Sequence, residues 1–96
     1  MPQYVITAHD FKDENALKRR TEARPDHLEK AKELKTKGNF VKAAALLDEN
    51  QNMNGSVMLM DFESEEELQQ WLKSEPYILQ KVWDKVDIAE AKIATL

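Results

Sequence analysis

The chain contains no cysteine, only two glycines and three prolines among its 96 residues, and no long hydrophobic run. Without cysteine it forms no disulfide and has no thiolate for catalysis or metal binding, so it needs no oxidising compartment. No stretch reaches the roughly 20 apolar residues of a membrane span, and the first residues lack the basic and apolar segments of a secretion signal. We therefore expect a cytoplasmic protein with no membrane contact.

Histidine is also scarce, with two residues, and the net charge is −4. Two imidazoles without cysteine argue against a zinc site, and there is no glycine-rich phosphate loop, so we expect neither a metal nor a cofactor. The acidic balance argues against non-specific binding of nucleic acid, which requires a clustered basic face. The length suits one domain over residues 1–96, small enough that a second chain would add useful burial.

The first part of the chain predicts a strand and a broken helix. Residues 4–9 are β-branched and aromatic, with Tyr4, Ile6 and Ala8 on one face of the expected strand. A helix is expected over residues 13–23, with acidic residues in its first turn. Pro25 suits a first helical position, so we expect a new or kinked helix to start there.

This second helical segment should end at Gly38, which is typical of a helix stop. Its expected buried stripe is Leu28, Ala31 and Leu34. Residues 39–47 have helical propensity, but they follow the helix stop and are joined by a polar run to another strand, so we predict a strand.

The second half of the chain predicts one strand, two helices and a final strand. Residues 56–62 form the clearest strand, apolar on both faces. Ser64 and Glu67 fit a capping box for a helix that buries Leu68, Trp71 and Leu72. Pro76 begins a short helix, and residues 83–91 form the last strand.

The resulting order, βαββαβ, predicts an α+β ferredoxin-like fold: a four-stranded antiparallel sheet with helices on one face. Because the strand over residues 56–62 is apolar on both faces, the open face of the sheet needs a cover. We expect a homodimer through this face, which closes an α+β barrel with twofold symmetry. The alternative is a monomer whose open face is covered by a loop and the chain end.

Several short motifs, spread over nearly the whole chain, resemble the YCII-related (YciI-like) family. They are Tyr4-Val5-Ile6 to Asp10, Arg20, Arg24-Pro25-Asp26-His27-Leu28, Gly38, Gly55-Ser56, Asp61-Phe62 and Glu75-Pro76-Tyr77. The resemblance implies a small bacterial cytoplasmic protein with the dimeric α+β barrel fold. Most of the family has no assigned reaction, and its known chemistry includes lyase-type steps such as removal of a halide from a hydroxylated ring.

The resemblance also implies a pocket with a histidine and an acid acting as an acid/base pair, which fall on His27 and Glu75. Two positions depart from the family pattern. Glu75 replaces the usual aspartate and carries its charge one methylene further out, and Ala43-Ala44-Ala45 replaces Ala-Gly-Pro at the end of the second strand, where a backbone turn shapes the pocket.

His27 and Glu75 also have structural interpretations. Near the start of a helix, exposed amides disfavour the imidazolium, while a nearby carboxylate favours it, which can poise His27 as a base. Lone histidines, however, are more often surface or structural residues. Glu75 could simply cap the short helix before Pro76.

We expect the substrate to contact four further residues: Arg24, Ser56, Tyr77 and His9. Arg24 could clamp an anion, or it could pair with a local acid, Asp26 or Glu22. Ser56 could donate to a ligand or simply belong to a turn, and His9 could line the cavity or be a half-buried residue at a strand end.

The sequence thus favours a cofactor-independent enzyme that uses His27 and Glu75 for lyase-type acid–base chemistry on a small aromatic or anionic molecule. The alternative is a non-catalytic small-molecule-binding or interaction module that retains the fold. In that alternative, His27 and Glu75 should lie too far apart to share a proton.

Overall fold

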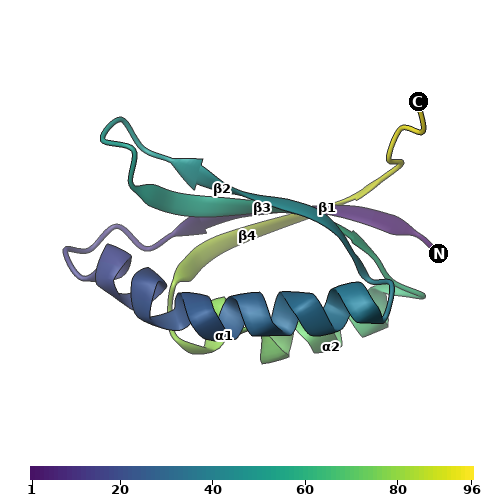
Figure 1. The fold of residues 1–96 in the computed structure, drawn as a ribbon, viewed down its shortest axis with the longest axis horizontal. Coiled ribbons are helices and arrows are strands. Elements are labelled where there is room, and N and C mark those ends of the chain that lie inside the picture. Colours follow the sequence, from purple (N-terminus) through teal and green to yellow (C-terminus); the bar gives the residue numbers. More distant parts are fainter.

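The computed structural model describes residues 1–96 as a four-stranded sheet covered on one face by helices (Figure 1). Its elements, in chain order, are β1 (Gln3–Asp10), α1 (Ala16–Thr36), β2 (Phe40–Leu47), β3 (Met53–Asp61), α2 (Glu65–Ser74), α3 (Pro76–Leu79) and β4 (Trp83–Ala91). The strands are antiparallel and lie in the order β2-β3-β1-β4. The predicted ferredoxin-like fold is confirmed.

Strict alternation in β1 decides which side chains face the helices. Tyr4, Ile6 and Ala8 are buried in the core, whereas Val5 and Thr7 lie on the face of the sheet opposite the helices and are only half-buried. A register shift between β1 and β4 follows His9, and Asp10 is the last buried residue of the strand. The strand therefore delivers one carboxylate into the layer between sheet and helices.

The predicted break in the first helix is wrong. A single helix, α1, runs from Ala16 to Thr36 with Pro25 in its interior. Pro25 has no backbone N–H to donate to the carbonyl of Thr21. Pro25 and Thr21 are both exposed, so this carbonyl lies on the solvent side of the helix. The helix also begins later than expected: Asp13 precedes it, accepts the backbone N–H of Asn15 at 3.2 Å and pairs with Arg19 at 2.7 Å.

The predicted stripe of α1 is confirmed only in part, since Leu34 is buried and Ala31 is half-buried. Leu28 is exposed, and the buried side chains are Ala16, Arg20, Ala23, His27 and Leu34. Their spacing of three, four and seven residues is the ordinary period of a helix face. The inward face of α1 therefore carries two polar side chains, because contacts with the rest of the fold set its rotation.

The predicted strand over residues 39–47 is confirmed as β2, despite its alanine content. Gly38 ends α1 with a φ of 85°, a left-handed conformation that glycine adopts without strain. In β3, Gly55 is needed for space, because a Cβ there would lie 2.7 Å from the carbonyl oxygen of Ala8.

The predicted starts of α2 and α3 are confirmed. The Ser64 side chain accepts the backbone N–H of Glu67, which caps α2. Pro76 begins α3 and holds Glu75 in an extended conformation between the two helices. No helix in the structure combines the length and apolar character needed to cross a bilayer.

The face of the sheet opposite the helices carries no covering element (Figure 1). Its centre is apolar, since Val5 pairs with Leu59 across β1 and β3, and Val57 pairs with Ala44 across β3 and β2. Val5, Val57 and Leu59 are half-buried by their neighbours alone. We name this surface, formed by Val5, Val57 and Leu59, the bare sheet face.

Candidate functional site

His27 and Glu75 meet in the layer between α1 and α3. The imidazole Nδ1 contacts the carboxylate Oε1, and both side chains are buried. The same oxygen lies 3.4 Å from the backbone N–H of Tyr77, so Glu75 also caps α3 as its structural interpretation predicted. Glu75 therefore both contacts His27 and caps α3. The contact contradicts the wide separation that the non-catalytic alternative predicted.

His27 does not lie near the start of a helix, where the sequence placed it. Because α1 begins at Ala16, His27 lies in the middle of the helix and far from the exposed amides of its first turn. Its environment is set instead by Glu75 and by aromatic rings. Tyr77 stacks on the imidazole at 4.0 Å between ring centroids with a 10° interplanar angle, and Trp83 meets it edge-on at 6.1 Å.

A second buried polar group lies beside this pair. Arg20 donates from Nη1 to both oxygens of Asp10, at 2.8 and 3.0 Å, and from Nη2 to Ser56 at 2.8 Å. Its guanidinium carbon lies 4.7 Å from the centroid of the Tyr77 ring. Burial raises the pKa of Asp10, and the charge of Arg20 and its hydrogen bonds oppose that rise.

Sequence reasoning gave Asp10 and Arg20 no role, although both fall within the motifs of the family resemblance. The spacing of both residues in the sequence nevertheless indicated that they face the core. Asp10 follows Tyr4, Ile6 and Ala8 in the period of two that marks the inward face of a strand. Arg20 precedes His27 by seven residues, or about two helical turns, which places both on one side of α1.

Tyr77 fills the space between Arg20 and His27. Its ring contacts both residues, and its hydroxyl is buried with no acceptor for its proton in the protein. Burial raises the pKa of Tyr77, while the nearby charges of Arg20 and Arg24 and a hydrogen bond from Arg24 oppose that rise. The phenol therefore stays protonated at neutral pH and has a proton to donate.

These side chains surround a cavity of about 110 Å³, which we name the histidine cavity. It is lined by Arg20, Arg24, His27, Leu28, Ala43, Ala44, Ala45, Ser56, Met58 and Tyr77. The three alanines belong to β2 and pair with Met58, Val57 and Ser56 of β3, so the strand continues through them in regular register. Four predicted site residues are therefore brought together here: Arg24, His27, Ser56 and Tyr77.

Arg24 has no carboxylate partner, so the local ion pair considered from the sequence is absent. Its Nη1 lies 3.0 Å from the sulfur of Met53. Asp26 accepts instead from the side chain of Gln80 at 3.2 Å. Arg24 thus brings an uncompensated positive charge to the rim of the cavity.

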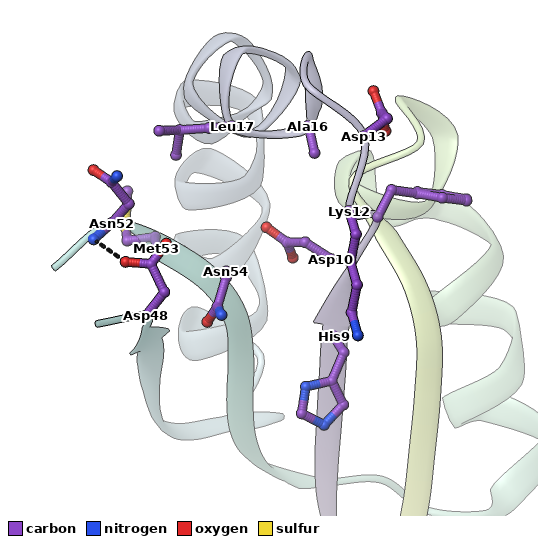
Figure 2. Close-up of a pocket in the computed structure, with 11 residues that line it drawn as sticks. His9, Asp10, Lys12, Asp13, Ala16, Leu17, Asp48, Asn52, Met53 and Asn54 are labelled. Carbon is purple, nitrogen blue, oxygen red and sulfur yellow. Dashed lines mark hydrogen bonds between the residues drawn. The ribbon is translucent and has the colours of Figure 1, made fainter. Parts of the chain in front are cut away.

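His9 does not join the others, which corrects its predicted place. It is exposed at the end of β1 and lines a different cavity of about 370 Å³, drawn in Figure 2. That cavity lies between the β1–α1 connection and the β2–β3 hairpin, where Asp48 accepts the backbone N–H of Asn52 at 3.0 Å. In Figure 2 the Asp10 carboxylate points into it, so Asp10 and its partner Arg20 separate the two cavities.

No group of three or more histidine, aspartate or glutamate side chains is arranged to hold a metal ion.

Comparison with known proteins assigns the family. The YCII-related domain matches residues 3–92. This chain belongs to the YCII-related family. YciI from Escherichia coli O6:H1 and YciI from Shigella flexneri are each 32% identical to it over 95 residues, which cover 93% of this chain and 95% of theirs.

Solved structures share the fold of this YCII-related chain. The 5-chloro-2-hydroxyhydroquinone dehydrochlorinase of Burkholderia phenoliruptrix AC1100, solved in complex with 2,5-dihydroxybenzoquinone, superposes with a TM-score of 0.82 at 18% identity, covering 96% of this chain and 95% of its own. A dimeric ferredoxin-like protein of unknown function from Jannaschia sp. CCS1 gives a TM-score of 0.59 at 11% identity, covering 97% and 100%.

Proposed function

We propose that this YCII-related protein is a cofactor-independent enzyme that uses His27 as an acid–base catalyst, oriented by Glu75, for lyase-type chemistry on a small hydroxylated or anionic molecule. The observation that carries the proposal is the buried contact between His27 and Glu75 at the wall of a cavity. Positioned proton transfer of this kind contributes roughly 10²–10⁴-fold to a rate.

The contact with Glu75 supports a separate role for each ring nitrogen. A carboxylate accepts the proton of Nδ1–H, which fixes that tautomer and leaves a lone pair on Nε2. Nε2 has no hydrogen-bond partner in the protein, and His27 lines the cavity. Nε2 is therefore the base, and Glu75 stabilises the imidazolium that forms when it accepts a proton.

In a lyase-type step, Nε2 of His27 removes a proton from one substrate atom. The electron pair left behind forms a double bond to the neighbouring atom, and the leaving group departs from that atom with its own bonding pair. The imidazolium then returns its proton to the solvent or to the leaving group, which restores the base. Arg24, Ser56 and Tyr77 are placed to hold the substrate, since all three line the same cavity.

The dehydrochlorinase activity of a protein that shares this fold supports a halide as one leaving group, and the hydroxylated quinone bound to that protein supports a hydroxylated ring as the substrate. The compound named in its activity, 5-chloro-2-hydroxyhydroquinone, is accordingly the first substrate to test.

Chloride release from this compound, measured with the purified protein, tests the function. We expect His27→Ala to lose roughly 10²–10⁴-fold in kcat/KM, and Glu75→Ala to lose most of the same factor. His9→Ala is the matched control, since His9 lies in the other cavity, and it should retain the wild-type rate. A His27→Ala variant as active as the wild type would refute the assignment.

We also propose that the protein functions as a homodimer joined through the bare sheet face. Val5, Val57 and Leu59 present adjacent apolar side chains there, and no element of the same chain covers them. Removing apolar surface from water contributes about 25 cal/mol per Å², so covering this face is worth several kcal/mol. The dimeric ferredoxin-like neighbours support this arrangement.

A further inference from the structure

The histidine cavity contains more hydrogen-bond donors than acceptors, and this imbalance identifies the class of ligand. Two of its side chains, Ser56 and Tyr77, have a hydroxyl proton with no acceptor in the protein, and a third, Arg24, donates to the sulfur of Met53 but to no carboxylate. The charge and the donor pattern together specify what a ligand must bring.

The Ser56 hydroxyl can act only as a hydrogen-bond donor toward the cavity. Its Oγ accepts an N–H from Arg20 at 2.8 Å and another from the indole of Trp83 at 3.3 Å. A hydroxyl has two lone pairs and one proton, so both acceptor positions are in use. The remaining O–H has no acceptor in the protein, although the residue is 4% exposed and lines the cavity.

The Tyr77 hydroxyl is the second donor. It is fully buried beside Arg24, which is itself a donor, so the hydroxyl proton has no acceptor in the protein, although the residue lines the same cavity. A buried polar group without a partner destabilises the free protein, so a ligand that supplies an acceptor gains affinity from relieving that cost.

Arg24 is the third donor and the source of charge. Its side chain donates to the sulfur of Met53, which is a weak acceptor. The positive charge of Arg20 is matched by Asp10, whereas that of Arg24 is matched by no carboxylate. Arg24 therefore presents a positive charge at the cavity rim next to two neutral donors, while the Glu75 carboxylate lies behind the imidazole of His27.

From these contacts we infer that the histidine cavity binds an oxyanion, a carboxylate or a phenolate, through Arg24, Ser56 and Tyr77. The inference takes the cavity of the proposed enzyme as its site and names the substrate class. The anionic oxygen is held by these donors, and the ligand atom beside it is presented to His27.

The cavity volume limits the size of the ligand. At about 110 Å³ it is smaller than the roughly 150 Å³ cavity that encloses benzene. A carboxylate fits entirely, whereas a ring that bears an oxyanion would leave its far edge toward the opening. Acetate and benzoate are therefore suitable probes, with acetamide and benzamide as uncharged partners of the same shape.

The test measures binding of these four compounds by isothermal titration calorimetry with the wild-type protein at neutral pH. We expect acetate or benzoate to bind and its amide to bind at least tenfold more weakly. Arg24→Gln should weaken binding of the anion by about tenfold to a hundredfold, because a charged hydrogen-bond donor is lost. Tyr77→Phe keeps the ring stack, removes only the hydroxyl and should weaken binding less.

Lys18→Gln is the matched control, since it removes one positive charge from an exposed position on the same helix. It should leave anion affinity unchanged. The inference is overturned if the wild type binds neither anion at millimolar concentration, binds anion and amide equally, or shows the same affinity after Arg24→Gln.

His27→Ala separates this inference from the proposed reaction. Anion binding that persists in His27→Ala, together with its loss in Arg24→Gln, supports the oxyanion site even if no turnover is ever found. Turnover that depends on His27 but is unaffected by Arg24→Gln would support the enzyme and overturn the oxyanion site.

Discussion

At the residue scale, the chain places two buried polar pairs side by side and lets one tyrosine touch both. His27 contacts Glu75, Arg20 binds Asp10, and the Tyr77 ring lies against both basic residues. Buried charges are costly unless they are paired and hydrogen-bonded, so these contacts are conditions for folding as well as for chemistry.

The first prediction concerns the tautomer of His27. If the Glu75 carboxylate holds Nδ1–H, then Glu75→Ala should remove that preference and shift the neutral ring toward Nε2–H. The ¹⁵N chemical shifts of the imidazole report which nitrogen carries the proton. The exposed His9 serves as an internal reference, and identical His27 spectra in the two proteins would show that Glu75 does not orient the ring.

The second prediction concerns the ion pair between Arg20 and Asp10. Asp10→Ala should lower the free energy of unfolding by about 3–5 kcal/mol, because it leaves the Arg20 charge buried and unpaired. Adding Arg20→Met should restore part of that loss, since no buried charge then remains. Urea unfolding measures both values, and a double variant less stable than Asp10→Ala would contradict this explanation.

At the scale of the elements, α1 gathers most of the site. It carries Arg20, Arg24 and His27 on successive turns, and it stays continuous across Pro25. Its inward face could hold polar side chains because α3 and β1 supply their partners, Glu75 and Asp10. The buried face of α1 therefore carries polar site residues, whereas the apolar pattern predicted only core residues there.

The third prediction tests the interior proline of α1. Pro25→Ala should raise the free energy of unfolding by about 2 kcal/mol, because a proline inside a helix costs about 3 kcal/mol and part of that is offset by its stiffening of the unfolded chain. Thermal and urea unfolding measure the change. A loss of stability would mean that α1 depends on the local geometry of proline.

At the scale of the whole molecule, the helices lie on one side of the sheet and the other side is bare (Figure 1). The histidine cavity is on the helix side, since side chains of α1 and α3 line it. A twofold dimer through that face would cover the apolar surface and leave α1 and α3 outside.

The fourth prediction is that the wild-type protein sediments at twice its chain mass of 11.1 kDa, and that Leu59→Glu sediments as the single chain. A charge at the centre of the bare sheet face cannot be buried without a partner. Leu79→Glu is the control, because Leu79 is exposed on the helix side, and it should remain dimeric. A wild-type protein of 11.1 kDa at micromolar concentration would exclude the dimer.

Local signals in the sequence were enough to predict the order of the elements. Alternation marked β1, the Ser64 cap marked α2, and Gly38 and Pro76 marked a helix end and a helix start. The family motifs also identified His27 and Glu75 as a pair.

How these elements pack against one another became known from the folded chain. The fold kept α1 continuous through Pro25, turned Leu28 outward, placed His9 in another cavity and brought Asp10 to Arg20. The rotation of a helix and the pairing of side chains far apart in sequence depend on packing against other elements. Local propensity carries no information about those contacts.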